Sequence, residues 1–544
     1  MLVGRGYSDP ASALAFLDRG LPSMGDPFAL DGMQEAVTRL RRAVDRGERI
    51  AVYGDYDADG VTSTALLLRV FRALGASVEP FLPSRFDEGY GLSIAGVRKC
   101  IETTRPGLIL TADCGSRSDE AVLAASHAGV DTIVTDHHEL DGALAPTVVI
   151  NPKRGADPDL ACLAGVGVAL KVCHAVLKAM RRDGDRRAET VDLRKYLDLV
   201  AVGTVADVAP LSGENRILVR AGLRTLNAQP CAGLAALMER AGIRMPVDSR
   251  QIGFVIGPRL NAAGRLANIG PDEALALLMA DSVEQAMPAA EKLERANQER
   301  RKIESDVLDE ALSQIGGNTG MAAVTVGGGG WHVGTIGIVA ARLCGRFNRP
   351  AAVVSMEPDG SGKGSCRSVE GVDVVRALAE CAEHLDAYGG HAMAAGFRLK
   401  AGALGGFAER FASACLKHGT RDAGTGLRID SWIGLRDATP ELLTACGRCE
   451  PFGIGNPVPV WAVAGISLCG EPRVLGGKHL GFRVTDGDAA VPAIAFNKGD
   501  AVIGAGSVDL AFRVAADPYR GADAIQLQVV AWRDASGGTC SRGV

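Results

Sequence analysis

The sequence predicts an α/β protein of several domains, and three observations lead to this fold class. Short β-branched runs alternate with helical stretches through the first half, which predicts a parallel sheet. A strongly charged stretch over 288–315 predicts one long helix. Beyond residue 451, short strands separated by Gly, Asp and Pro predict a small β-barrel. At 544 residues, the chain has room for about three or four domains.

Short apolar runs in the first half mark the strands of the predicted sheet. The predicted strands are 50–53, 78–82, 108–111, 132–135 and 148–150, and the predicted helices are 61–74, 119–127 and 165–180. Ligands of such sheets bind at the carboxyl ends of the strands. We therefore expect functional side chains directly after these runs.

The charged stretch 288–315 carries a sparse apolar stripe. The stripe consists of Leu293, Ile303, Val307, Ala311 and Ile315. Pro288 is tolerated near the start of a helix. The pattern fits a connector between two domains and equally a surface helix packed on one domain.

A second α/β region and a set of short strands are predicted in the second half. An apolar strand at 322–326 precedes four glycines at 327–330, which we interpret as a flexible break, and the α/β region continues to about residue 420. The last predicted strands are 461–468, 480–484, 493–496, 509–514 and 525–532. Five short strands in so little sequence are typical of a small barrel.

Composition and charge narrow the class of protein. Apolar residues make up 47% and charged residues 23% of the chain, which is typical of folded globular protein. No apolar run is long enough for a membrane span, and residues 1–9 do not resemble a secretory signal, so we expect the protein in the cytoplasm. A net charge of −5 argues weakly against a protein coated in nucleic acid but allows a local basic channel.

Thirteen cysteines are scattered singly along the chain. Only Cys446 and Cys449 have the spacing of metal ligands, and no second pair accompanies them. A structural zinc site needs four ligands. We interpret the cysteines as buried reduced thiols, with a zinc site as the alternative, and they fit a reducing compartment.

Acidic and histidine side chains cluster after the predicted strands. Asp55, Asp57 and Asp59 follow the first strand, Asp113 follows the run at 108–111, and Asp207 follows an apolar run at 199–205 that we also interpret as a strand. The strand at 132–135 is followed by Asp136, His137 and His138. Closely packed carboxylates need a cation or raised pKa values, and this set suffices for two Mg²⁺ or Mn²⁺ ions. Two such ions can activate a water and stabilise the leaving oxygen of a phosphodiester, so we predict a metal-dependent phosphodiesterase.

A calcium loop is the alternative interpretation of the first acidic segment. Asp55, Asp57, Asp59 and Gly60 occupy positions 1, 3, 5 and 6 of such a loop. Position 12 should be Glu, but Leu66 stands there, and the segment follows a strand and not a helix. We therefore favour the catalytic interpretation.

Four ordered motifs resemble those of the DHH phosphoesterase superfamily, and within it the RecJ family of bacterial single-strand-specific DNA exonucleases. Residues 52–64, 112–115, 136–138 and 202–211 resemble the superfamily motifs, and residues 258–266, 330–340, 389–397 and 450–457 resemble later segments of that family. The resemblance extends from about residue 45 to 535. It implies a parallel-sheet DHH domain, a connecting helix, a DHH-associated domain and an OB-fold barrel.

The resemblance also implies roles for the clustered residues. Asp57, Asp59, Asp113, His137 and Asp207 would hold two ions, Mn²⁺ or Mg²⁺, with Asp113 as the bridge. Asp55 would support that shell, His138 would face the scissile phosphate, and Asp136 completes the catalytic set. The implied reaction is 5′→3′ hydrolysis of single-stranded DNA to 5′ mononucleotides in repair and recombination. Some family members carry His where this chain has Tyr53, so one metal site either has fewer ligands or never needed that His.

A strand of DNA has to be held without reading its sequence, which requires basic side chains, backbone N–H groups and stacking aromatics. The candidate contacts are Arg259, Asn261, Arg265, Lys363, Arg367, Gly389, Gly390, His391 and Phe496. For each basic residue a surface salt bridge is the alternative. Phe482, Phe496, Tyr519 and Trp532 could stack on bases, although barrel aromatics are more often core residues.

The predicted domains follow from the pattern and the resemblance together. They are 1–44 (N-terminal extension), 45–282 (DHH domain), 283–318 (connecting helix), 319–425 (DHH-associated domain), 426–454 (linker) and 455–544 (OB-fold domain). Single-stranded DNA is the expected partner, with a single-strand-binding protein and a helicase as further candidates and no membrane. The alternatives are a DHH phosphodiesterase for oligoribonucleotides or cyclic dinucleotides, and a non-catalytic DNA-binding DHH protein.

Overall fold

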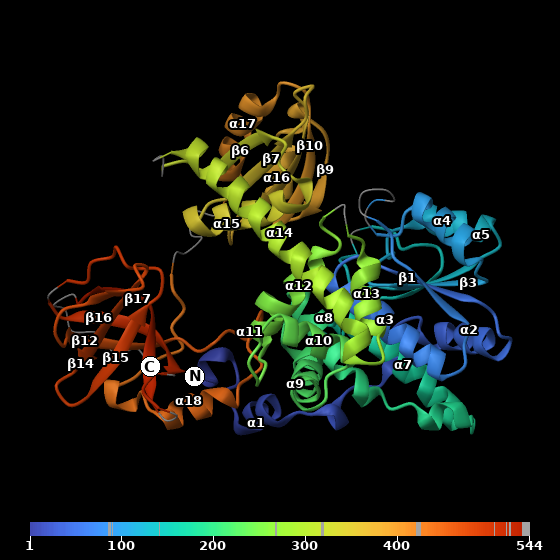
Figure 1. Cartoon of the computed structure of the whole chain (residues 1–544), viewed down its shortest axis with the longest axis horizontal. Helices are drawn as coiled ribbons and strands as arrows, with labels where there is room; N and C mark the ends of the chain where they lie inside the picture. The colour runs from blue at the N-terminus through green and yellow to red at the C-terminus, as the bar shows by residue number, and fades with distance from the viewer. Residues whose placement is uncertain are drawn as a thin grey trace.

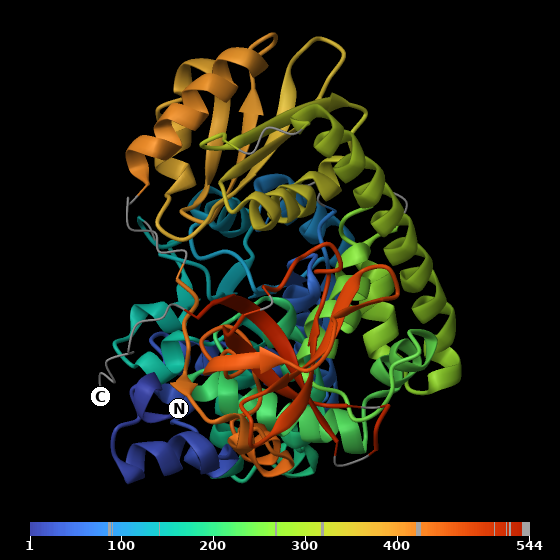
Figure 2. The ribbon, with the colours of Figure 1, turned by 90° about the vertical axis from the view of Figure 1, so that its left-hand side faces the viewer.

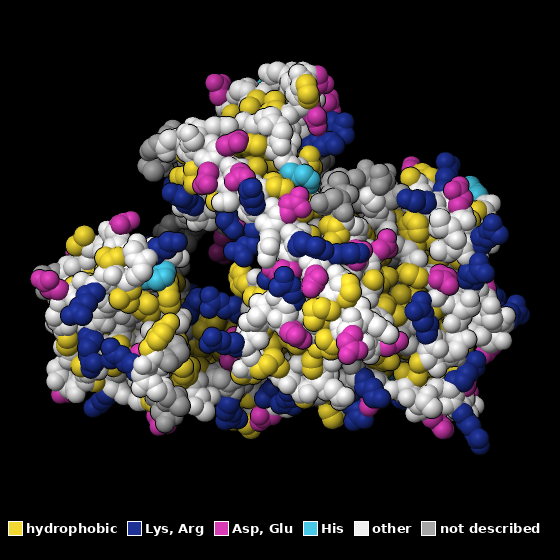
Figure 3. Space-filling model, in the orientation of Figure 1, with side chains coloured by type: hydrophobic (Ala, Val, Ile, Leu, Met, Phe, Trp, Pro, Cys, Tyr) yellow, Lys and Arg dark blue, Asp and Glu magenta, His cyan; other side chains and the backbone are white. Residues whose placement is uncertain are grey.

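A computed structural model shows three lobes (Figure 1), and the space-filling view shows a central opening between them (Figure 3). It describes residues 1–84, 89, 91–140, 142–266, 269–316, 320–419, 426–504, 506–517, 519–521 and 524–535. The predicted domain boundaries at 318/319 and at 425 lie outside these residues. We call the lobes the first α/β domain, the second α/β domain and the C-terminal β domain, which lie at the right, top and left of Figure 1. Figure 2 shows the same lobes from the side.

The first α/β domain contains the predicted parallel sheet. Its strand order is β2-β1-β3-β4-β5, and all neighbours run parallel. The strands are β1 (Ile50–Gly54), β2 (Val78–Phe81), β3 (Leu108–Ala112), β4 (Asp131–Thr135) and β5 (Val148–Ile150). Strands β1 and β3 are buried along their whole length, as their apolar sequences predict. The five predicted strands are therefore confirmed.

Helices surround this sheet and build a helical layer beside it. They are α2 (Met33–Asp45), α3 (Ala58–Ala73), α4 (Ile94–Thr104), α5 (Asp119–His127), α6 (Pro158–Ala161), α7 (Gly165–Arg182), α8 (Leu197–Ala206), α9 (Gly213–Ala228), α10 (Ala232–Arg240), α11 (Ser249–Gln251), α12 (Gly257–Ala262) and α13 (Pro271–Met279). Helices α3, α7 and α8 pack on one another, and their apolar residues belong to one large core.

The predicted strand at 199–205 is wrong, because these residues form helix α8. Its residues from Leu197 to Thr204 are all buried between neighbouring helices. A helix that is apolar on every side has no amphipathic periodicity, so its short apolar run cannot be distinguished from a buried strand. Asp207 thus lies at the C-terminal end of a helix and not of a strand.

The long helix α14 (Val283–Ile315) connects the two α/β domains (Figure 1). Its first half packs against α10, α12 and α13, and its second half packs against α15 and β6 of the second domain. The connector interpretation of the charged stretch is therefore correct. Pro288 lies in the early turns of the helix, as expected.

The second α/β domain has the strand order β6-β7-β8-β10-β9. Its elements are β6 (Val324–Gly329), α15 (Val333–Phe347), β7 (Ala351–Met356), β8 (Gly362–Arg367), α16 (Val374–Ala379), β9 (Leu385–His391), β10 (Ala394–Leu399) and α17 (Leu404–His418). The expected flexible break at 327–330 is wrong for its first three glycines, which continue β6 beside β7. A Cβ on Gly328 would lie 2.4 Å from the Trp331 ring, so glycine there makes room for the indole.

The C-terminal β domain is one seven-stranded sheet in the order β11-β12-β16-β17-β15-β14-β13, with an additional pairing of β12 and β14. Its elements are β11 (Ser431–Trp432), α18 (Pro440–Gly447), β12 (Trp461–Leu468), β13 (Arg473–Leu475), β14 (His479–Thr485), β15 (Ala490–Ala495), β16 (Val508–Ala516) and β17 (Ile525–Asp534). The five predicted strands are present, and the two short strands β11 and β13 were not predicted. Within the described part of the chain, no helix is long and apolar enough to cross a membrane.

Candidate metal centre

Acidic and imidazole side chains meet at the carboxyl edge of the parallel sheet. Asp55 follows β1, Asp113 follows β3, and His137 follows β4. Because these strands are neighbours and parallel, their carboxyl ends bring the three side chains together. Asp207 reaches the same place from the end of α8, with its carboxylate 3.7 Å from His137 Nε2.

The ligand atoms form three overlapping groups, each with its atoms within 4.8 Å of one another. The groups are Asp113–His137–His138, Asp59–His137–Asp207 and Asp55–Asp57–Asp113. His137 Nε2 lies 3.1 Å from Asp113 Oδ1 and 3.8 Å from Asp59 Oδ2. Because Asp113 and His137 are each shared by two groups, the arrangement can hold two neighbouring cations. All eight predicted catalytic residues except Asp136 belong to one of these groups.

The backbone around the cluster is locally constrained. Asp57 caps α3, and its Oδ1 accepts from the N–H groups of Asp59 and Gly60, 3.0 Å away in both cases. Asp113 has a φ of 68° and Val208, next to Asp207, a φ of 62°. Both lie in the left-handed region, which a β-branched residue such as Val208 rarely adopts. Strained residues of this kind cluster at functional sites.

Glycines at the start of α7 and within α8 let helices approach the carboxylates, and the sequence analysis did not identify them. The Gly165 and Val166 N–H groups donate to the Asp59 carboxylate at 2.7 and 2.8 Å. A Cβ on Gly165 would lie 2.5 Å from Asp113 Oδ1, and one on Gly203 would lie 2.9 Å from Asp59 Oδ1. For Gly165, the one signal in the sequence was its position at the beginning of the predicted helix 165–180.

Burial and mutual repulsion raise the pKa values of the carboxyls. Burial, followed by the charge of Asp57, raises the pKa of Asp55 to about 8 and that of Asp59 to about 7. Burial and the charges of Asp59 and Asp57 raise the pKa of Asp207 to about 9. The pKa of Asp113 rises well above its usual value for the same reasons. Without a cation, this cluster would therefore hold protons at neutral pH.

The unpaired atoms of the cluster fit a divalent metal. Asp113 Oδ1 and His137 Nε2 are buried and have no hydrogen-bond partner. Buried polar atoms in proteins are normally satisfied, so two such atoms 3.1 Å apart indicate a ligand between or beside them. Carboxylate oxygens with one imidazole suit Mn²⁺ and Mg²⁺. Burial and the nearby charge of His138 lower the pKa of His137 to about 3, which leaves its imidazole neutral and able to ligate.

Asp136 holds His138 and belongs to none of the three ligand groups. Asp136 Oδ1 lies 2.7 Å from His138 Nδ1, and its Oδ2 accepts from the Ser116 N–H at 2.9 Å. Burial opposes charge on both groups, but their mutual hydrogen bond outweighs it, so the pKa of Asp136 is lowered and that of His138 is raised to about 9. His138 therefore carries a positive charge at neutral pH.

Two alternatives from the sequence can now be assessed. The calcium loop is excluded, because the segment runs from β1 directly into α3 and Leu66 is buried in the core. Tyr53 is fully buried, its ring packs against Phe81 and its hydroxyl donates to Gly91 O at 3.2 Å. It belongs to none of the three ligand groups. The structure thus favours the interpretation in which Tyr53 simply completes the strand core.

Three predicted DNA contacts from the segment after residue 257 have partners within the protein. Arg259 forms an ion pair with Glu294 of α14 at 2.5 Å and also donates to Val255 O. Asn261 Oδ1 accepts from the Ala58 N–H at 2.7 Å, so it supports the metal-binding turn. Arg265 donates to Gly334 O at 3.4 Å, across the junction of the α/β domains.

The predicted contacts of the second α/β domain lie at the end of its edge strand β9 and on β8. Gly389, Gly390 and His391 are exposed at the end of β9. The pKa of Glu139 is lowered first by its hydrogen bond to Lys153, and His391 and His137 contribute to the same shift. Lys363 is exposed on β8, and Arg367 at the end of β8 donates to Ser365 Oγ at 3.0 Å.

The four aromatic candidates of the C-terminal domain divide into two pairs. Phe482 and Trp532 belong to or pack against the apolar core. Phe496 is 46% exposed with its ring against His479, and Tyr519 is 94% exposed. Only the second pair is available for stacking.

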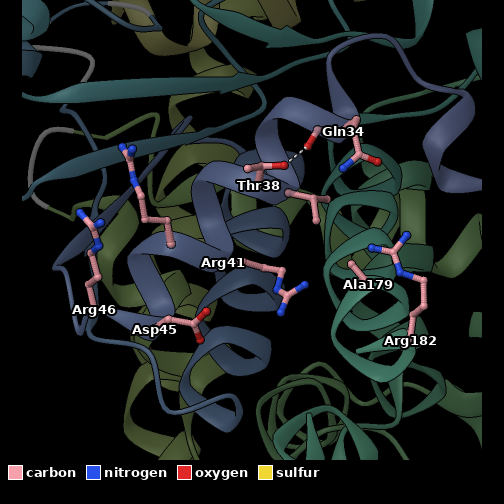
Figure 4. A pocket seen from close by; sticks show the side chains of 9 residues that line it. Gln34, Thr38, Arg41, Asp45, Arg46, Ala179 and Arg182 are labelled. Carbon is pink, nitrogen blue, oxygen red and sulfur yellow. Dashed lines mark hydrogen bonds between the residues drawn. The ribbon is translucent and has the colours of Figure 1, made fainter. Parts of the chain in front are cut away.

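Several hollows of the molecule lie outside the metal cluster. A pocket of about 420 Å³ between α2 and α7 is lined mainly by polar residues, including Arg41, Arg46 and Arg182 (Figure 4). It contains none of the metal-centre residues. The central opening between the lobes is bordered by Lys and Arg side chains on the face shown in Figure 3.

Cys446 and Cys449 are free thiols and belong to no metal-ligand group among the described residues.

Known families match three segments of this chain. Residues 49–204 match the DHH family, N-terminal domain, residues 317–417 the DHHA1 domain and residues 429–531 the RecJ OB domain. The single-stranded-DNA-specific exonuclease RecJ of Escherichia coli is 35% identical over 540 residues, which cover 94% of this chain and 92% of that protein. The RecJ of Bacillus subtilis is 35% identical over 92% of this chain, and the match spans 63% of that longer protein, less than two thirds.

Solved structures agree with these matches. RecJ of Thermus thermophilus in complex with Mn²⁺ superposes with a TM-score of 0.83 at 32% identity, covering 98% of this chain and 75% of that one. An exonuclease RecJ bound to manganese gives a TM-score of 0.62 at 36% identity, covering 73% of this chain and 97% of that one. By its domains, its fold and its similarity over almost its whole length, the chain belongs to the RecJ family.

Proposed function

We propose that this chain is a metal-dependent exonuclease that degrades single-stranded DNA from the 5′ end and releases 5′ mononucleotides in repair and recombination. The observation that carries the proposal is the buried pair of Asp113 Oδ1 and His137 Nε2, which lack hydrogen bonds at the carboxyl edge of the sheet. Membership of the RecJ family supports the substrate and the direction of hydrolysis.

The residues of the cluster have separate roles in this proposal. Asp57, Asp59, Asp113, His137 and Asp207 would hold two Mn²⁺ or Mg²⁺ ions, with Asp113 as the bridge and Asp55 supporting the shell. When bound, such ions activate a water and stabilise the leaving oxygen of a phosphodiester. Asp136 keeps His138 protonated and oriented, so His138 offers a positive charge to the scissile phosphate.

The strand would run from the metal centre through the basic opening to the C-terminal domain. Gly389 and Gly390 offer bare backbone opposite the metal centre, with His391, Lys363 and Arg367 as phosphate contacts. Phe496 is exposed and could stack on a base. Asn261 accepts from the Ala58 N–H in the metal-binding turn, and Arg259 pairs with Glu294 of α14. We therefore propose that these two residues position parts of the protein and do not contact DNA directly.

End-labelled substrates test this function and its alternatives. Purified protein with Mn²⁺ is incubated with 5′- or 3′-labelled single strands of DNA and RNA, and Asp113→Ala is the inactive control. Mononucleotide released at once from the 5′ label of DNA supports the proposal. Hydrolysis of only short oligoribonucleotides or cyclic dinucleotides would indicate the other DHH activities, and binding without hydrolysis would indicate a non-catalytic protein. A pull-down with single-strand-binding protein or a helicase tests these two candidate partners, and cell fractionation tests the expected cytoplasmic location.

A further inference from the structure

Residues 1–24 lie between the first α/β domain and the C-terminal β domain. Both ribbon views place this segment beside the chain that leads into the C-terminal sheet (Figures 1 and 2). It contains the helix α1 (Pro10–Asp18), and Met1 packs against the apolar core of the C-terminal domain. The segment thus touches both domains. Neither the proposed hydrolysis nor the predicted DNA contacts use it.

Arg5 joins the segment to the C-terminal domain through a buried ion pair. Its Nε and Nη2 donate to the two carboxylate oxygens of Asp430 at 2.6 and 2.9 Å, and its Nη1 donates to Asn456 Oδ1 at 3.0 Å. The Arg5 and Asp430 side chains are 8% and 6% exposed. Asp430 also accepts from the Val460 N–H at 2.9 Å, just before β12. This fork of hydrogen bonds fixes orientation as well as distance.

Arg216 of α9 joins the same parts from the side of the first α/β domain. Its guanidinium lies 3.9 Å from the centre of the Phe16 ring, and its Nε donates to Phe16 O at 3.1 Å. Its Nη1 donates to Cys449 O at 2.8 Å, and Asn456 Nδ2 donates to the same carbonyl at 2.8 Å. A single buried side chain therefore connects α1, α9 and the loop before the C-terminal sheet.

The loop held by these two arginines, residues 449–456, also contacts the backbone next to the metal centre. The Leu211 N–H donates to Ile454 O at 2.7 Å, and Ser249 Oγ donates to Phe452 O at 2.6 Å. Leu211 belongs to the short segment that follows Asp207, between α8 and α9. Hydrogen bonds through Arg5 and this loop therefore connect Asp430 with Leu211, four residues after Asp207.

We propose that residues 1–24 form a clasp that fixes the C-terminal domain relative to the metal centre, with Arg5 and Arg216 as positioning residues for strands long enough to reach both. This inference rests on the proposed nuclease function. A strand bound by the C-terminal domain then reaches the metal centre with an effective concentration that depends on the fixed geometry. A loosened clasp would weaken the use of long strands and spare short ones, which contact only the metal centre.

Arg5→Ala and Asp430→Asn test the clasp from its two ends, and the second variant keeps an acceptor for the Val460 N–H. Hydrolysis is measured with a strand of about 4 nucleotides and one of about 30, because an OB domain occupies about 4–16 nucleotides. We expect kcat/KM for the long strand to fall at least fivefold through KM, and that for the short strand to stay within twofold. The double variant should lose no more than either single variant, because both remove the same interaction.

Arg19→Ala is the matched control. Arg19 belongs to the same segment and pairs with Asp159 at 2.6 Å, but that pair joins the segment only to the first α/β domain. It should leave the ratio of long-strand to short-strand kcat/KM unchanged. Arg5→Ala or Asp430→Asn variants that fold and keep the wild-type ratio would overturn the functional part of the proposal.

Hydrogen exchange tests the clasp without any nuclease activity. In Arg5→Ala the amides of Leu211, Gly453 and Asn456 should exchange at least tenfold faster than in the wild type, and in Arg19→Ala they should not. Unchanged exchange in Arg5→Ala would refute the clasp itself. A wild type that is inactive on both strands would refute the proposed function, while the exchange rates would still decide whether the clasp exists.

Discussion

Replacing Asp113 by Asn should stabilise the metal-free protein and remove most of its stabilisation by Mn²⁺. Asp113 is 1% exposed, so burial raises its pKa, and the charges of Asp59, Asp57 and Asp207 raise it further. Asparagine has nearly the same shape without the charge, so it removes repulsion from the cluster. The two effects have opposite signs, which distinguishes them from general damage to the fold.

The magnitude follows from the geometry. Ligand atoms of the cluster lie within 4.8 Å of one another, where two unit charges repel by about 3 kcal/mol at an effective dielectric constant near 20. Partial protonation reduces this, so we expect a gain of about 2 kcal/mol. For a domain of about 200 residues this raises the Tm by about 4–8 °C. In the wild type, Mn²⁺ at about 100 times its Kd should add about 2.7 kcal/mol, and the variant should lose most of that gain.

The effect should depend on pH with a defined sign. The pKa values of Asp55, Asp59 and Asp207 are about 8, 7 and 9 in the folded protein, above the ordinary value of 3.8. Folded protein therefore binds more protons than the unfolded chain, and the stability of the metal-free wild type falls as pH rises from about 4 to about 9. The gain from Asp113→Asn should accordingly be larger near pH 8.5 than near pH 5.5.

Thermal unfolding in EDTA and in Mn²⁺, at both pH values, measures these effects. Asp198→Asn is the matched control: Asp198 is also buried but accepts from the Cys231 and Leu199 N–H groups, away from the metal centre. It should not stabilise the metal-free protein, and it should keep the Mn²⁺ response. A normal Mn²⁺ response in Asp113→Asn, or a lower Tm than the wild type in EDTA near pH 8.5, would refute the reasoning.

Three further substitutions probe the surroundings of the cluster, each read out by Mn²⁺ titration calorimetry. Gly165→Ala places a Cβ 2.5 Å from Asp113 Oδ1 and should weaken Mn²⁺ binding at least tenfold. Gly167→Ala should not, because its Cβ would meet the Leu163 side chain at 3.0 Å and Asn215 Oδ1 at 3.7 Å and no residue of the metal centre. Asn261→Leu removes the acceptor of the Ala58 N–H and should weaken Mn²⁺ binding about 10-fold or more, because contacts that support metal ligands contribute about that much to affinity. An unchanged affinity would show that Asn261 does not support the metal centre. Tyr53→Phe should leave the Mn²⁺ affinity within twofold, and it should lower the free energy of unfolding by about 1 kcal/mol because the hydrogen bond to Gly91 O is lost. A tenfold loss of Mn²⁺ affinity would instead assign Tyr53 to the metal site.

Local patterns predicted most of the first sheet and most of the cluster. Strands β1 and β3 are largely apolar and β4 is rich in β-branched residues. Polar residues follow directly at their carboxyl ends, so these side chains had to meet once the sheet was parallel. The connecting helix was predictable from its charge pattern, and the five longer strands of the last domain from their spacing. Family motifs supplied roles that the residues alone could not.

Features that depend on packing between distant segments could not be predicted. Helix α8 was mistaken for a strand because a fully buried helix lacks a polar face. Nothing in the sequence indicates that Arg259 meets Glu294, that Asn261 meets Ala58, or that Gly165 lies against Asp113. The pair of Arg5 and Asp430 is the extreme case, because it joins opposite parts of the chain.

Anomalous diffraction at the manganese edge from crystals grown with Mn²⁺ tests the central claim most directly. The account predicts two peaks, about 3.5–4 Å apart, within the cluster of Asp57, Asp59, Asp113, His137 and Asp207, and with Asp113 touching both ions. A cluster without a peak, or a single ion that leaves Asp113 or His137 uncoordinated, would contradict a two-metal centre at this edge of the sheet.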